Sequence, residues 1–168
     1  FVTQTRQLGT GDAVKSCLPL LEGYEGPALV LVGDEPLIRP QPLADLLARQ
    51  REDKAACLLG TAVVPDPTGF GRILRDSAGR FLRIVEERDC NAEERRIDEI
   101  NPSCYVFELP ALWDALDQIN TSNAQGEYYL TDAPEQLMRT GGKVLALNVL
   151  SADDILGVNT RQHLAQAG

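Results

Sequence analysis

The sequence predicts an α/β fold with a Rossmann-like, doubly wound and mostly parallel mixed sheet. Continuous apolar runs at residues 28–32 and 55–64 are typical of strands buried on both faces of a parallel sheet. Helix-like segments such as residues 41–50 alternate with these runs, which is the pattern of a layered α/β domain. A polar turn at residues 76–79 separates two more strand-like runs, so we also expect one antiparallel hairpin.

The expected elements follow from these patterns and from their boundary residues. Thr10 is expected to cap the first helix, and Pro40 and Pro42 suit the start of the second. The first half should contain a strand end at 1–3, a helix at 9–21, a strand at 28–32, a helix at 41–50 and a strand at 55–64. The second half should contain strands at 72–75 and 81–87, a strand within 97–107, helices at 110–119 and 128–139, a strand at 143–149 and a helix at 160–166.

Composition limits the function. The 168 residues suit one domain, and the net charge of −9 with only 5% aromatic residues argues against a nucleic-acid partner. No apolar run approaches the ~20 residues of a membrane span, and no signal peptide is evident, so we expect a cytoplasmic protein without a membrane partner. The four cysteines lack C-x-x-C spacing, which disfavours a zinc site. His163, the only histidine, lies in an expected polar helix, so a Ser–His or Cys–His couple has little support.

Two segments indicate chemistry. Residues 7–13 form a glycine-rich turn that leads into a helix, where backbone N–H groups can approach a ligand closely. The apolar strand at 28–32 is followed by Gly33 and Asp34, which places a carboxylate at the carboxyl edge of the sheet. A carboxylate there suits Mg²⁺, which prefers few protein oxygens together with substrate phosphates. Taken alone, Asp34 is equally compatible with an ordinary turn residue.

Seven motifs occur in one order: QLGTGDA, VGDEPLI, DPTGFGRI, IVEERD, EIN, NAQGEYYLTD and GVNTR. With them the chain resembles, from Gln4 to Arg161, the sugar-nucleotide nucleotidyltransferases, and among these the pyrophosphorylase (uridyltransferase) domain of the bacterial bifunctional N-acetylglucosamine-1-phosphate uridyltransferases. The resemblance implies the nucleotide-diphospho-sugar transferase fold. It also implies that UTP and N-acetylglucosamine 1-phosphate react, with Mg²⁺, to give UDP-N-acetylglucosamine and pyrophosphate. The resemblance further implies a cytoplasmic enzyme of cell-wall precursor synthesis, and it allows a homo-oligomer in the full-length form.

The resemblance also assigns site residues. Asp34 would be catalytic, as a metal ligand together with Asn159. The nucleotide would be bound by Gln4, Gly9, Thr10 and Gly33. The sugar would be bound by Gly71, Glu86, Asn101, Tyr129 and Thr131. Taken singly, Glu86 or Tyr129 is more often a solvated or packing residue, and Asn159 is more often a turn residue.

The chain departs from the family in three respects. The glycine-rich L-x-x-G-x-G-T-R-M loop and its following lysine are missing, so residues 1–168 are expected to be an N-terminally truncated, partial domain that binds product but does not turn over. The β-helical acetyltransferase domain is missing as well. Pro102-Ser103 stands where the family commonly has Thr-Gly, which brings the sugar specificity into question. The alternatives are a nucleotidyltransferase for another sugar 1-phosphate and a non-catalytic sugar-nucleotide-binding module.

Overall fold

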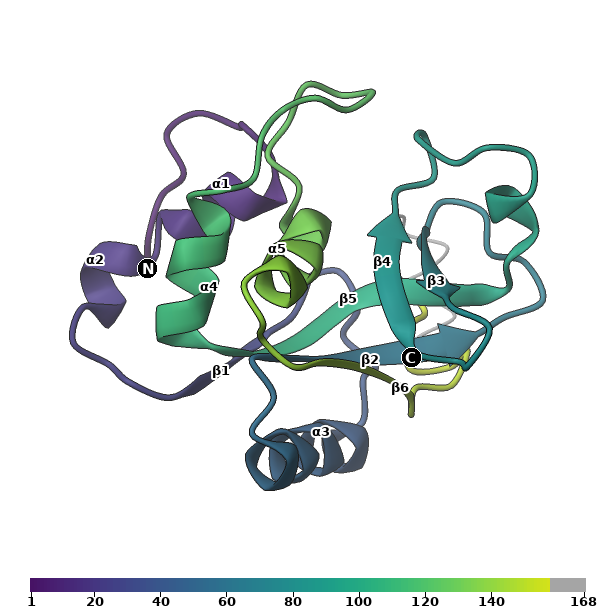
Figure 1. Cartoon of the computed structure of the whole chain (residues 1–168), viewed down its shortest axis with the longest axis horizontal. Coiled ribbons are helices and arrows are strands. Elements are labelled where there is room, and N and C mark those ends of the chain that lie inside the picture. The colour runs from purple at the N-terminus through teal and green to yellow at the C-terminus, as the bar shows by residue number, and fades with distance from the viewer. Residues whose placement is uncertain (158–168) are drawn as a thin grey trace.

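The computed structural model describes residues 1–157 as three layers, with helices on both faces of a six-stranded sheet (Figure 1). Helices α1 (Thr10–Lys15), α4 (Leu109–Leu116) and α5 (Ala133–Arg139) lie on one face, and α3 (Pro40–Asp53) lies on the other. This arrangement confirms the predicted layered α/β fold. No helix among residues 1–157 combines the length and the apolar character needed to cross a bilayer.

The sheet contains six strands in the order β4-β3-β5-β2-β6, and β1 also pairs with β5. The strands are β1 (Pro27–Val30), β2 (Cys57–Val63), β3 (Gly71–Arg75), β4 (Phe81–Val85), β5 (Glu99–Glu108) and β6 (Val144–Asn148). Short helices complete the chain: α2 (Leu18–Leu21), η1 (Glu94–Arg96) and η2 (Leu130–Asp132).

The prediction of a mostly parallel sheet was wrong. Among the described strands, β2 and β6 pair in parallel, whereas the other four pairings are antiparallel. The cause is β5, which lies between β1 and β2 and runs opposite to both. Strands β1, β2 and β6 therefore share one direction, as the apolar runs suggested, but the inserted strand separates β1 from β2.

Strand β5 organises the region that matters for function. One edge pairs with β2 along most of its length, from Glu99 to Phe107. The other edge is divided: residues 105–108 pair with β1 and residues 100–101 pair with β3. Among the described strands none pairs with residues 102–104 on this second edge, so the sheet splits there between β1 and β3.

Successive side chains of β2 and β5 point to opposite faces of the sheet, and they form two hydrophobic cores, one on each face. Cys57, Leu59, Tyr105 and Phe107 pack beneath α4 and α5, and their neighbours in sequence face α3. Leu46 of α3, which is fully buried, closes the second core. Burial of both faces explains why these strands are continuous apolar runs.

Several element boundaries differ from the prediction. Residues 1–3 form no strand, since no described strand lies beside them. The helix expected at 9–21 is divided after Lys15, because the ring of Pro19 would clash with the Lys15 carbonyl in a continuous helix. Gly9, not Thr10, is the N-cap of α1. The helix expected at 160–166 lies outside the described residues.

The helix expected at 128–139 begins later than predicted. Tyr128 is held by two backbone hydrogen bonds to the α1 region: its N–H donates to the Leu8 carbonyl, and its carbonyl accepts from the Gly11 N–H, both at 2.8 Å. Tyr129 is consequently extended, and α5 starts only at Ala133 after the short η2. The remaining predicted strands and helices within residues 1–157 are confirmed to within a few residues.

Candidate functional site

A cavity of about 220 Å³ lies where the sheet splits between β1 and β3, and we call it the split-edge cavity. Helix α1 and the end of β1 supply most of its apolar wall. Its polar lining comes from four segments that are distant in sequence, through Thr10, Glu86, Ser103 and Thr131. Three of these four residues were predicted site residues. The fold therefore brings a residue predicted to bind the nucleotide and residues predicted to bind the sugar to one place.

Glu86 and Thr131 form the polar wall of this cavity. Glu86 follows the last residue of β4, and Thr131 lies in η2, where its hydroxyl donates to Glu86 Oε1 at 2.9 Å. Burial raises the pKa of the Glu86 carboxyl, while the Thr131 hydrogen bond opposes the rise. A partly desolvated carboxylate with acceptor capacity left is suited to bind the hydroxyl groups of a sugar.

Gly71 and Asn101 are paired residues of β3 and β5, directly beside Glu86. A Cβ at Gly71 would lie 2.9 Å from Ile84 Cγ2 and 3.7 Å from Glu86 Oε2, so glycine is required for this close approach. Asn101 is buried and lies outside the lining of the split-edge cavity. Its amide nitrogen donates to the Tyr105 hydroxyl at 2.7 Å, so part of its hydrogen-bonding capacity serves the core.

A second, acidic hollow of about 190 Å³ lies on the other side of the Glu86–Thr131 hydrogen bond, and Tyr129 faces it. The carboxyls of Asp89 and Asp132 also line it. Burial, and after it the charges of Glu135, Glu86 and Asp89, raises the pKa of Asp132 to about 6. Tyr129 and Thr131 were predicted to act together, but of these two only Thr131 lines both hollows, as Glu86 also does.

The residues predicted to hold the nucleotide are grouped at the start of α1. The Gln4 side-chain nitrogen donates to the Gly9 carbonyl at 3.1 Å and to Asp12 Oδ2 at 2.7 Å. Thr10 Oγ1 accepts from the Leu130 N–H at 3.0 Å. Gly9 has a φ of 111°, and a Cβ there would lie 2.6 Å from the Tyr128 carbonyl oxygen. The close contact that requires glycine at position 9 is therefore a contact with the protein's own backbone at Tyr128.

Asp34 lies in an open hollow of about 700 Å³ that also contains Glu35 and Asp66. Gly33 precedes it in an exposed turn with open space around its Cα. Burial, followed by the neighbouring Asp34 charge, raises the pKa of Glu35 to about 8. Asp34 lies two positions after Val32, which lines the split-edge cavity, so the two hollows adjoin along the chain.

Of the two predicted metal ligands, the structure describes Asp34 but not Asn159. Asn159 lies outside the described residues, so its position relative to Asp34 stays a prediction. Within residues 1–157, no group of three or more acidic, cysteine or histidine side chains is arranged to hold a metal ion. The carboxylate of Asp34 is a hard oxygen donor in an open hollow, which agrees with the chemistry of magnesium ligands.

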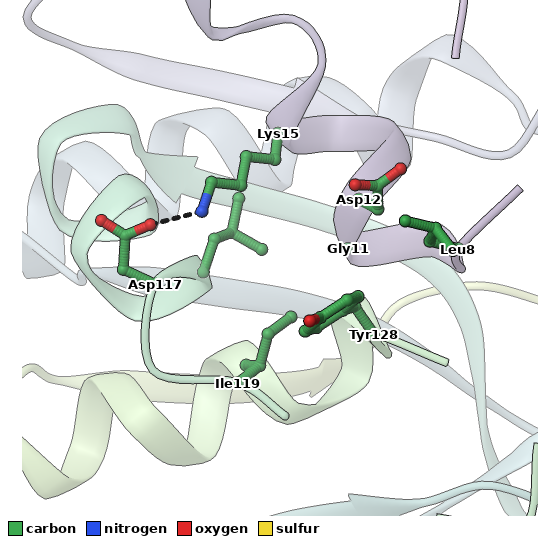
Figure 2. Close-up of a pocket in the computed structure, with 8 residues that line it drawn as sticks. Leu8, Gly11, Asp12, Lys15, Asp117, Ile119 and Tyr128 are labelled. Carbon is green, nitrogen blue, oxygen red and sulfur yellow. Dashed lines mark hydrogen bonds and ion pairs between the residues drawn. The ribbon is translucent and has the colours of Figure 1, made fainter. Parts of the chain in front are cut away.

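A further cavity of about 370 Å³ lies between α1 and α4 (Figure 2). Figure 2 shows the ion pair of Lys15 and Asp117 on one side of this cavity and the side chains of Ile119 and Tyr128 on another. Lys15 Nζ lies 2.5 Å from Asp117 Oδ1. None of the predicted site residues lines it. Its greater size therefore does not make it the better candidate site.

Sequence reasoning overlooked two residues that belong to this region. Tyr105 was seen only as part of an apolar strand, yet its hydroxyl is the partner of Asn101. Glu35 was not considered, although a second carboxylate directly after Asp34 is visible in the sequence. The first residue has no local signal, because strand pairing alone places it. The second could have been found from the Asp-Glu pair itself.

Comparison with known proteins shows the family to which the chain is related. A sequence model of the family described as Nucleotidyl transferase matches residues 1–159. The chain is 46% identical over 99% of its length to the bifunctional protein GlmU of Synechococcus sp. (strain JA-2-3B'a(2-13)) and 45% identical over 98% to that of Pelobacter propionicus. A GlmU protein of Lactococcus lactis subsp. cremoris (strain SK11) is 46% identical over 99% of the chain. The chain spans 26–36% of the length of these relatives.

A solved structure shares the fold. The crystal structure of UDP-glucose pyrophosphorylase complexed with UDP-glucose superposes with a TM-score of 0.65 and covers 86% of this chain and 55% of that one. The sequence identity is 14%. This likeness confirms the nucleotide-diphospho-sugar transferase fold.

Proposed function

Since the chain belongs to the nucleotidyl transferase family, we propose that it forms the uridyltransferase part of an enzyme that converts UTP and N-acetylglucosamine 1-phosphate into UDP-N-acetylglucosamine and pyrophosphate. One observation carries the choice of this reaction: the chain is about 45% identical, over nearly its whole length, to bifunctional GlmU proteins. The motif order that first indicated the reaction runs through the same residues. The structural neighbour supports the fold only.

The reaction requires a sugar phosphate and a nucleotide to be held in line. An oxygen of the sugar phosphate forms a bond to the α-phosphorus of UTP, and the bond from that phosphorus to the bridging oxygen breaks, so pyrophosphate leaves. The protein contributes mainly position and charge stabilisation. In our proposal Glu86 and Thr131 hold sugar hydroxyls in the split-edge cavity. Gly71 lies beside Glu86 and Asn101 braces the Ser103 backbone, both outside the cavity lining. Gln4, Gly9 and Thr10 hold the base at the start of α1.

Asp34 and Asn159 would hold a magnesium ion. Bound there, the ion would neutralise negative charge on the phosphates, which a chain with a net charge of −9 does not do by itself. Asp34 follows the end of β1 and lies two residues beyond the cavity wall at Val32. This position of Asp34 supports a role as metal ligand beside a phosphate attached to the sugar.

Binding of UDP-N-acetylglucosamine with and without magnesium tests the proposal. We expect titration calorimetry on the purified protein to show weaker binding when EDTA replaces Mg²⁺. Asp34→Asn should abolish this difference, whereas Asp45→Asn, an exposed change on α3, should retain it. Turnover is tested by release of pyrophosphate from UTP and N-acetylglucosamine 1-phosphate by the product of the complete reading frame. A protein that binds neither UTP nor any UDP-sugar would contradict the proposal.

One residue favours an alternative substrate, namely another sugar 1-phosphate. Ser103 lines the split-edge cavity where the family commonly has glycine. A screen that includes glucose 1-phosphate distinguishes the two substrates. We expect N-acetylglucosamine 1-phosphate to be used faster.

A further inference from the structure

Ser103 has an unusual backbone conformation for its place in the fold. It lies in the middle of β5, yet its φ is 57°, in the left-handed region. Among residues 1–157 the other non-glycine residue with a positive φ is Lys54, which ends helix α3. Left-handed residues are common at helix ends but not inside strands. The conformation of Ser103 is therefore a local strain that the surrounding structure must maintain.

A bulge in β5 produces this conformation. Gly60 and Ala62 of β2 are two positions apart, whereas their partners Cys104 and Ile100 are four apart, so β5 carries extra residues between them. A bulge bends its strand and redirects the side chain at the extra position. Ser103 is unpaired on the opposite edge as well, where the sheet splits between β1 and β3.

A buried pair of side chains braces the bulge. Asn101 Oδ1 accepts from the Ser103 N–H at 3.3 Å, and Asn101 Nδ2 donates to the Tyr105 hydroxyl at 2.7 Å. Asn101 is 4% exposed and Tyr105 is fully buried. Asn101 and Tyr105, two residues before and two residues after Ser103, thus hold the bulge in its conformation.

The bulge places Ser103 in the wall of the split-edge cavity, together with Glu86 and Thr131. We propose that Ser103 is a ligand-binding residue whose hydroxyl discriminates between sugar nucleotides that differ in one polar ring substituent. This inference rests on the proposed function, because it takes the split-edge cavity to be the sugar site. A hydroxyl can both donate and accept, so it can bind an amide or a hydroxyl of the sugar.

Discrimination follows from the surroundings of this hydroxyl. The remaining lining near it is largely apolar, from Val30 to Val32 of the β1 end and from Leu130. In such a wall, a ligand group that meets the serine hydroxyl gains a hydrogen bond. A ligand without that group lacks this hydrogen bond and therefore binds more weakly than a ligand that makes it.

Two substitutions separate the strain from the hydroxyl. Ser103→Ala removes the hydroxyl and keeps the strain, whereas Ser103→Gly removes both. Lys54→Gly is the matched control, since it relieves the same kind of strain at an exposed position outside the cavity. The readouts are the melting temperature without ligand and the Kd values of the 168-residue protein for UDP-N-acetylglucosamine and UDP-glucose, which differ only at one ring position.

We expect both glycine variants to melt at a higher temperature than the wild type and Ser103→Ala to melt at a similar temperature. Both Ser103 variants should change the ratio of the two Kd values by roughly five- to tenfold, the effect of one neutral hydrogen bond. Lys54→Gly should leave this ratio unchanged. The alanine variant keeps the bulge, so its altered ratio cannot arise from relief of strain.

Two outcomes overturn the inference, and they can be told apart. If the wild type binds UDP-sugars and the ratio of the two Kd values in Ser103→Ala and in Ser103→Gly equals that of the wild type, the role of Ser103 is refuted while the proposed function stands. If the wild type binds neither UDP-sugar, the proposed function fails and this inference fails with it.

Discussion

Arg39 and Asp154 tie the start of helix α3 to the segment that follows β6. The Arg39 guanidinium donates to both oxygens of Asp154 at 2.7 Å, and the Arg39 backbone N–H donates to Oδ1 at 3.1 Å. Ser151 adds its N–H and its hydroxyl at 2.8 and 2.7 Å. These bonds hold the pKa of the fully buried Asp154 carboxyl well below its usual range. The pair connects the segment after Asp34 to the segment that leads toward Asn159.

Asp154→Asn should therefore destabilise the protein in a pH-dependent way. Loss of one partner of a buried pair typically costs about 3–5 kcal/mol, and the 62% exposure of the Arg39 side chain reduces our expectation to about 2–3 kcal/mol at pH 7. The pKa of Asp154 is depressed on folding, so its stabilisation is complete above about pH 4 and falls as the pH drops toward the folded pKa. Urea unfolding at pH 7 and pH 3 should show a smaller difference from the wild type at pH 3. Arg80→Ala breaks an exposed pair and should cost less than about 1 kcal/mol.

Gly9→Ala should destabilise the protein by at least about 2 kcal/mol, since a Cβ would meet the Tyr128 carbonyl and the backbone is left-handed. Gly33→Ala is the matched control, because nothing lies near its Cα and its φ is not positive. We expect that control to stay within about 0.5 kcal/mol of the wild type. Thermal and urea unfolding measure both. Equal effects of the two substitutions would show that the contact between α1 and Tyr128 is unimportant.

Glu86→Gln should weaken binding of the sugar and not of the nucleotide. The carboxylate lies in the split-edge cavity and accepts from Thr131, and we expect its hydrogen bonds to sugar hydroxyls to be charge-assisted. We predict roughly a tenfold higher Kd for UDP-N-acetylglucosamine and little change for UTP. Glu52→Gln, an exposed change on α3, serves as the control. A similar loss for both ligands would count against the placement of the sugar.

Asp132→Asn should stabilise the protein at neutral pH. Burial and the nearby carboxylates raise the pKa of Asp132 from 3.8 to about 6, so the folded state binds the proton more tightly than the unfolded chain. Ionised Asp132 consequently lowers stability as the pH rises from about 4 to 6. Since the group is partly solvated, we expect the variant to gain about 1 kcal/mol at pH 7.5 relative to pH 4. Urea unfolding at the two pH values tests this, and a gain that is constant with pH would contradict it.

The sequence by itself determined most of the elements and the family, and its motifs predicted which residues would form the site. Runs such as 55–64 are apolar throughout because both faces of the sheet are covered, and this pattern is local enough to read directly. The turn at 76–79 likewise defined its hairpin, since turn chemistry acts over neighbouring residues. Glu86 and Thr131 could be named from motifs, although nothing in either motif shows that they are hydrogen-bonded to one another.

Only the tertiary structure decided how these pieces meet. The insertion of β5 between β1 and β2, and with it the antiparallel character of the sheet, depends on pairing between residues 36–81 positions apart. The same pairing splits one edge of β5, opens the cavity and produces the bulge at Ser103. Likewise, the glycine at position 9 was expected from a ligand-binding motif, but its steric requirement comes from Tyr128, which lies far away in sequence. Hydrophobic pattern and turn chemistry are local properties of the chain, whereas strand order and the contacts across a split sheet edge exist only once the whole domain is folded.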